Sequence, residues 1–183
     1  MNYLRGFIPW IAFAVVSSAG WQWGALTGLA LGAWLLFKDH QAGEAAGAKI
    51  LEISTVVYFA ALTAFAFARP DSGLQDYSGT LSFGWLAVTA WATLAVGRPF
   101  TTGIARKQAP REVWDTPLFR RINVVITAFW AASFTVTAAA LAAVYAGDLG
   151  SGVSIPVQVA GFAVAASFTA RYPERARAAS AQG

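Results

Sequence analysis

Six apolar runs occupy most of the 183-residue sequence, and their lengths limit the folds that the chain can adopt. A helix that crosses a bilayer needs roughly 17 to 25 apolar residues, because each residue adds about 1.5 Å along the helix axis. The last five runs reach or approach that length. The pattern therefore predicts an all-α membrane bundle of about six transmembrane helices, covering residues 4–18, 21–37, 50–67, 80–96, 122–145 and 153–169.

The composition supports a membrane environment for these runs. Apolar residues make up 57% of the chain and charged residues only 12%, whereas soluble domains carry roughly 25% charged residues. Too few polar side chains are present to cover a surface that faces water. We therefore expect a single transmembrane domain over residues 1–183, with a cytoplasmic tail at residues 172–183.

The positions of lysine and arginine predict the orientation of the helices, because cytoplasmic loops are enriched in both residues. With the N-terminus inside, only Arg69 falls on the outer side. The other twelve basic residues fall on the cytoplasmic side, which predicts that both termini are cytoplasmic. These twelve are Arg5, Lys38, Lys49, Arg98, Arg106, Lys107, Arg111, Arg120, Arg121, Arg171, Arg175 and Arg177.

The first run is the shortest, and Pro9 lies within it. Proline removes one backbone donor from a helix, so this run is either a kinked span or a helix that only dips into the bilayer. The charge distribution favours a crossing. The short connection from Ser17 to Gly20 predicts that the first and second runs form a hairpin.

Residues suited to catalysis or metal binding are scarce. The chain has no cysteine and a single histidine, His40, which excludes disulfides and cysteine-ligated metals. Asp39, His40 and Glu44 are close in sequence, but three neighbours on one loop provide little fixed geometry, so we interpret them as a solvated loop. We expect no catalytic residues, no metal, no cofactor and no enzymatic activity.

Two polar residues near the cytoplasmic ends of predicted helices are candidates for an intramembrane site. Glu52 lies three residues after Lys49, on the same helix face. It is either a functional carboxylate or half of an ion pair at headgroup depth, with Lys49 reaching water. Asn123 lies at similar depth, where amides usually join packed helices. A contact between Glu52 and Asn123 is compatible with the pattern.

The most distinctive polar stretch is the basic segment, residues 97–121, in which basic and aromatic side chains alternate. Trp114 and Phe119 are suited to anchor it at the membrane interface, with its bases on lipid phosphates. The alternative is an ordinary cytoplasmic loop with no specific ligand. The candidate residues for lipid or partner binding are Arg98, Arg106, Lys107, Arg111, Trp114, Arg120 and Arg121.

At the basic segment the sequence resembles the intracellular septation protein A family of bacterial inner-membrane proteins, as a distant relative. The likeness is carried by the opening Phe7, Ile8 and Pro9, by Pro99 after the fourth run, and by residues 112–114, 121–123, 128–134 and 171–173. The resemblance implies a multi-pass inner-membrane protein linked to cell division and envelope maintenance. It implies no catalytic residues.

These observations favour a non-enzymatic protein of the bacterial inner membrane that supports envelope maintenance or septation. Its expected partners are anionic lipid headgroups and membrane proteins of division or envelope synthesis, with no nucleic acid, and homo-oligomers are compatible with the sequence. The alternative is a transporter of small solutes or lipids. It would use a cytoplasm-facing cavity near Glu52 and Asn123.

Overall fold

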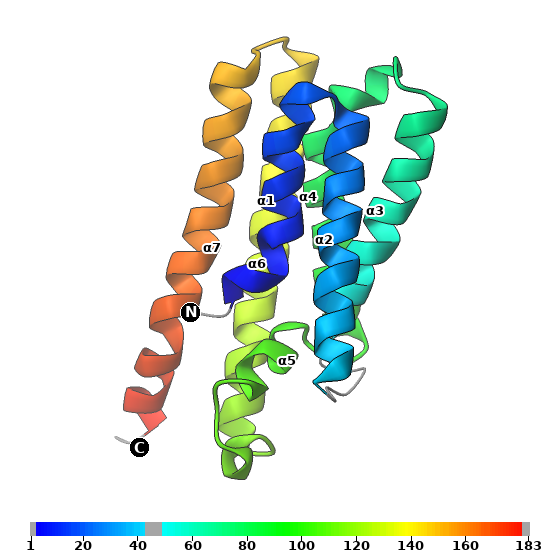
Figure 1. Ribbon diagram of the computed structural model, residues 1–183. Helices are drawn as coiled ribbons and strands as arrows, with labels where there is room; N and C mark the ends of the chain where they lie inside the picture. Colours follow the sequence, from blue (N-terminus) through cyan, green and yellow to red (C-terminus); the bar gives the residue numbers. More distant parts are fainter. Residues whose placement is uncertain (1–2, 43–48, 181–183) are drawn as a thin grey trace. The chain divides into compact units, whose positions relative to one another are not determined.

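The computed structural model describes residues 3–42 and 49–180, and its secondary structure is helical. Helices make up 85% of the structure, and no strand occurs in the described residues, so the all-α prediction is confirmed. The chain divides into two compact units, residues 1–78 and 79–183. The α-helices are α1 (Ile8–Val16), α2 (Trp21–Gln41), α3 (Ile50–Ala68), α4 (Ser78–Ala95), α5 (Thr101–Arg106), α6 (Pro117–Ala146) and α7 (Ser151–Ser180) (Figure 1).

The first unit begins with a continuous helical stretch in which 3₁₀ turns, Tyr3–Phe7 and Ser17–Ala19, flank α1. Pro9 lies in the first turn of α1, where a backbone N–H has no partner within the helix. Pro9 thus interrupts no hydrogen bond within α1, and the choice between a kinked span and a helix that only dips into the bilayer stays a prediction. Gly20 follows with a φ of 134°, which favours glycine, and α1 and α2 pack together as the predicted hairpin.

Glycines on one face of α2 let the neighbouring helices approach closely. Gly24, Gly28 and Gly32 are all buried and recur every four residues. A Cβ at Gly28 would lie 2.7 Å from the ring of Phe59 on α3. Small residues at this spacing are typical of helix contacts in membranes, where close van der Waals packing replaces the hydrophobic effect.

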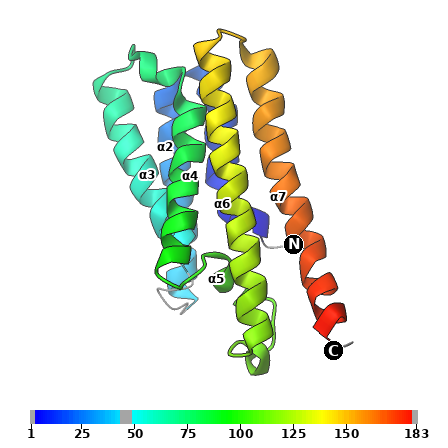
Figure 2. The ribbon, with the colours of Figure 1, turned by 180° about the vertical axis from the view of Figure 1, so that it is seen from behind.

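In the second unit, α6 and α7 lie side by side over most of their length (Figures 1 and 2). Gly161 makes this possible, because a Cβ at that position would overlap Thr137 on α6. Hydrogen bonds cross the same interface. Ser133 Oγ donates to the Gly161 carbonyl oxygen at 2.7 Å, and Trp130 Nε1 donates to Thr169 Oγ1 at 2.8 Å.

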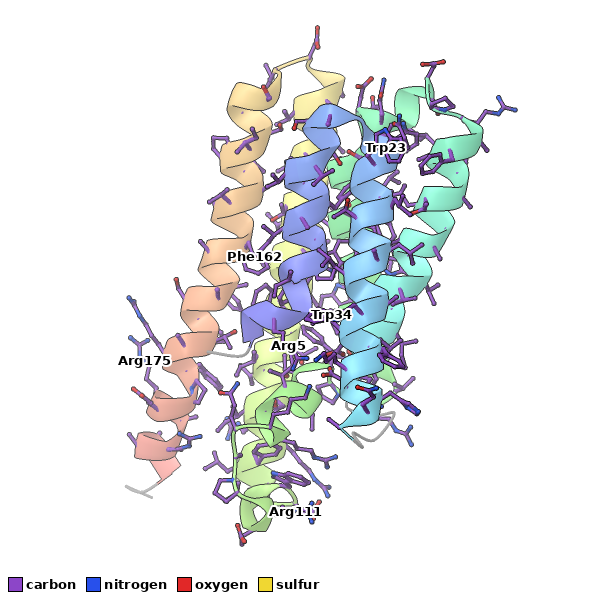
Figure 3. All side chains as sticks on the ribbon, viewed as in Figure 1. Arg5, Trp23, Trp34, Arg111, Phe162 and Arg175 are labelled. Carbon is purple, nitrogen blue, oxygen red and sulfur yellow. The ribbon has the colours of Figure 1, made fainter. Side chains whose placement is uncertain are left out.

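Several helix ends differ from the predicted bounds, and α2, for example, continues to Gln41 rather than ending at 37. α6 begins at Pro117 rather than 122, because Thr116 Oγ1 accepts a hydrogen bond from the Phe119 N–H and caps the helix. α7 continues to Ser180, through most of the predicted tail, because residues 174–179 are mainly alanine and arginine, which favour helix. Arg175 lies on this extension (Figure 3).

The outer faces of the helices are apolar. Three helices, α3, α6 and α7, are long and apolar enough to cross a membrane. Large apolar side chains remain exposed on several helices, including Val57 at 52%, Val88 at 65% and Val136 at 68%. Extended apolar surface of this kind needs lipid or a partner to cover it. The chain is therefore a membrane protein.

Candidate functional site

The basic segment is a folded structure in the second unit rather than a plain loop. It contains α5 and a 3₁₀ turn, Arg111–Val113. Thr101 anchors it to α6, since its Oγ1 donates to the Asn123 carbonyl oxygen at 3.1 Å. Thr101 Oγ1 also lies 2.8 Å from Thr127 Oγ1, and because Thr101 has only one proton to donate, Thr127 donates in this bond. The backbone that carries the basic side chains is thus held against α6.

Trp114 organises two of the predicted arginines. The guanidinium carbon of Arg106 lies 5.2 Å from the centre of the Trp114 ring, and that of Arg111 lies 5.7 Å from it. These distances are typical of cation–π contacts. The indole Nε1 donates to the Ala109 carbonyl oxygen at 3.0 Å, which fixes the ring. Trp114 therefore contacts arginine side chains of its own segment, in addition to any contact with lipid.

All six basic side chains of the segment are exposed. One of them, Arg120, forms an ion pair with Asp115, with 3.7 Å between Nη2 and Oδ1. Because both side chains are largely exposed to solvent, this pair contributes little to stability. Arg111 lies near the start of α6 (Figure 3). The arrangement presents concentrated positive charge beside a helix that is apolar enough to cross a membrane. Lysine and arginine side chains gathered in this way attract anions.

A second group of polar residues is buried in the first unit. Lys49 and Glu52, predicted from the sequence, lie at the start of α3 with exposures of 5% and 8%. Lys49 is thus buried, which differs from the expected extension to water. Glu52 has an interaction partner, but a pairing with Lys49 stays a prediction.

Asp39 is also buried. The prediction that Asp39 and His40 lie in a solvated loop is therefore wrong for Asp39. Both residues lie in the last turn of α2, and Asp39 is 3% exposed and 3.0 Å from the Arg5 guanidinium. Glu44 lies outside the described residues. The sequence contains a signal for the pairing of Arg5 with Asp39. The predicted hairpin brings the start of the first run near the end of the second, and these two residues have opposite charges.

Polar groups continue along the buried face of α3. Thr55 and Tyr58 follow Glu52 at intervals of three residues, so all three share one helix face. Trp10 on α1 donates from Nε1 to Thr55 Oγ1 at 3.1 Å and stacks on Tyr58 with 4.9 Å between ring centres. A buried hydrogen bond and a ring contact therefore join α1 to α3 within the first unit.

Asn123 bonds through its side chain to its own helix, so the predicted role of its amide in joining packed helices stays a prediction. It is 1% exposed, and its Nδ2 donates to the Phe119 carbonyl oxygen, one turn earlier in α6, at 2.9 Å. Its Oδ1 accepts no hydrogen bond from the residues that the structure describes. Asn123 and Glu52 belong to different units, so the contact between them stays a prediction.

Comparisons with family models, with curated proteins and with solved structures found no match to this chain. The resemblance to the intracellular septation protein A family therefore stays a prediction.

Proposed function

We propose that this chain is a non-enzymatic, multi-pass protein of the bacterial inner membrane that supports envelope maintenance or septation. It crosses the membrane six times with both termini in the cytoplasm, as the distribution of lysine and arginine favours. It acts through the basic segment, which contacts anionic lipid headgroups and envelope-synthesis proteins at the cytoplasmic surface.

The proposal rests on one observation: the exposed basic side chains are carried by a folded segment that is held against α6. An ordinary cytoplasmic loop needs positive charge for topology, but it does not need a helix tied to α6 through Thr101 or two arginines in cation–π contact with Trp114. Each lysine or arginine near an anionic surface contributes about 1 kcal/mol to membrane attachment. Fixing several of them on one scaffold lowers the entropy that is lost on binding.

Charge reversal tests this role. We expect the gene carrying Arg106→Glu, Lys107→Glu and Arg111→Glu not to rescue the altered cell length and wall-stress sensitivity of a deletion strain. The matched control reverses the exposed Arg171, Arg175 and Arg177 on α7, which changes the net charge by the same amount. We expect that control to rescue. Cell length and survival under wall-active stress are the measurements.

Insertion must be checked for both variants, because charge reversal also acts on topology. A periplasmic reporter fused after Gly150 should stay active in each, and one fused after Gln108 should stay inactive. Full rescue by the variant with a reversed basic segment would contradict the proposed role.

The buried polar group of the first unit favours transport as a second candidate function. Asp39, Lys49 and Glu52 are all buried near the facing ends of α2 and α3, and ionisable groups within membrane proteins often mark solute or proton pathways. In this hypothesis Glu52 is the coupling carboxylate.

Substitution of Glu52 separates the two functions. If Glu52 is structural, Glu52→Gln should keep most of the folded yield and of the rescue, since an amide can still hydrogen-bond. Glu52→Leu should then lower the free energy of unfolding by about 2 kcal/mol, because it leaves the partner of the carboxylate unsatisfied. The exposed Glu112→Gln is the control. A well-folded Glu52→Gln protein that fails to rescue would favour transport.

A further inference from the structure

The contacts of Trp114 leave the two arginines beside it chemically available. A cation–π contact uses the face of a guanidinium group or its charge, whereas the N–H donors point outward in the plane of the group. Arg106 and Arg111 are both exposed, and both lie within 6 Å of the same ring centre, at 5.2 and 5.7 Å. Two charges and up to ten N–H donors are thus held beside one indole ring.

The ring itself is held by its own chain. Trp114 Nε1 donates to the Ala109 carbonyl oxygen, which lies between Arg106 and Arg111 in the sequence. This bond closes the turn that carries both arginines. Trp114 is therefore a positioning residue, and it sets where the two guanidinium groups lie before any ligand arrives.

We infer that Arg106 and Arg111, positioned by Trp114, form a binding site for a lipid phosphomonoester headgroup, such as that of phosphatidic acid. The inference rests on the proposed function, in which the basic segment lies at the lipid surface. Trp114 is three residues before Pro117, where α6 begins, and α6 is apolar enough to cross the membrane. In the proposed function α6 crosses the membrane, so the phosphates that meet a basic segment just before α6 are those of lipid headgroups.

The chemistry distinguishes a phosphomonoester from the phosphodiester of most anionic lipids. A monoester carries a charge of about −1.5 to −2 at pH 7 and three terminal oxygens. A diester has one charge and two such oxygens. A pair of guanidinium groups matches the monoester in charge. Their four parallel N–H···O bonds can use all three of its terminal oxygens, whereas a diester offers only two.

Lipid titration of the full chain tests the inference. Purified protein in detergent is titrated with dioctanoyl phosphatidic acid, dioctanoyl phosphatidylglycerol and dioctanoyl phosphatidylcholine by calorimetry. We expect phosphatidic acid to bind about tenfold more tightly than phosphatidylglycerol, which is the effect of one additional charge-assisted hydrogen bond. Trp114→Leu should remove this preference and Trp114→Phe should keep most of it. The control Arg175→Gln, at an exposed position on α7 outside the basic segment, should keep all of it.

Lysine substitution gives a test that leaves Trp114 unchanged, for use if Trp114→Leu does not fold. Arg106→Lys with Arg111→Lys keeps both charges but loses the planar donors, so the preference for phosphatidic acid should fall about tenfold. An unchanged preference in this variant, or in a folded Trp114→Leu protein, would overturn the inference.

Further outcomes separate the inference from the proposed function. Equal binding of phosphatidic acid and phosphatidylglycerol, both tighter than phosphatidylcholine, overturns the specific site and leaves the proposed function standing. Equal binding of all three lipids overturns both. Inorganic phosphate at the same concentration should displace little phosphatidic acid. Complete displacement would assign the site to free phosphate instead of lipid.

Discussion

Replacing Trp130 with alanine should lower the free energy of unfolding by about 4 kcal/mol, as measured by denaturation in mixed micelles. Trp130 is 2% exposed on α6 and contacts two rings, Phe134 at 5.2 Å and Phe162 at 5.1 Å between centres. Figure 3 marks Phe162 on α7. Truncation would leave a cavity at the α6–α7 interface and remove the hydrogen bond to Thr169.

A second substitution separates packing from hydrogen bonding at this position. In Trp130→Phe the phenylalanine ring fills most of the volume of the tryptophan side chain, and Thr169 keeps its own hydrogen bond to the Ala165 carbonyl oxygen. The free energy of unfolding should therefore fall by only about 1 kcal/mol. The control is Trp91→Ala, because Trp91 is 48% exposed although it also donates to a threonine, Thr135. An equal loss for Trp91→Ala and Trp130→Ala would contradict the assigned packing role.

Replacing Gly161 with leucine should lower the free energy of unfolding by about 3 kcal/mol. A Cβ at Gly161 would overlap Thr137 Oγ1, so any larger side chain must push α6 and α7 apart. Separation would also break the bond from Ser133 to the Gly161 carbonyl oxygen. Unfolding in mixed micelles measures the loss.

The same helix offers a matched control for this substitution. Gly152 also lies in α7, but a Cβ at that position would meet no atom of the described residues within 4 Å, so Gly152→Leu should be close to neutral. Thr137→Ala should recover part of the stability of Gly161→Ala, because it removes the overlapping hydroxyl. If Gly152→Leu were as destabilising as Gly161→Leu, close packing at Gly161 would not account for the loss, since leucine favours helix over glycine at both positions.

The order of the helices follows from the local sequence, because hydrophobic run length and turn chemistry act over a few residues. The runs at 21–37 and 50–67 correspond closely to α2 and α3. The early start of α6 was also readable, since threonine followed by proline is a typical beginning of a helix. The buried Gly24, Gly28 and Gly32 of α2 have a spacing that the sequence displays, and it predicts a packed face.

The sequence also identified the residues of the basic segment, because charge and aromatic content need no structure to be recognised. It did not show that Arg106 and Arg111 share the ring of Trp114, nor that Thr101 ties the segment to α6. The first depends on how a turn brings together side chains up to eight residues apart. The second depends on a hydroxyl that meets a residue 22 positions away.

Asp39 in the first unit also shows the difference between what local sequence and tertiary packing determine. Local sequence placed it after the second apolar run, beside His40 and Lys38, where a charged residue is usually solvated. It is buried with an ion pair to Arg5, which lies 34 residues earlier in the sequence and is brought near by the packing of α1 against α2. The sequence by itself determined the helices, their order and the positions of the charges, because these depend on neighbouring residues. Only the tertiary structure decided which charges are buried and which side chains meet, because contacts between distant residues depend on how the helices pack.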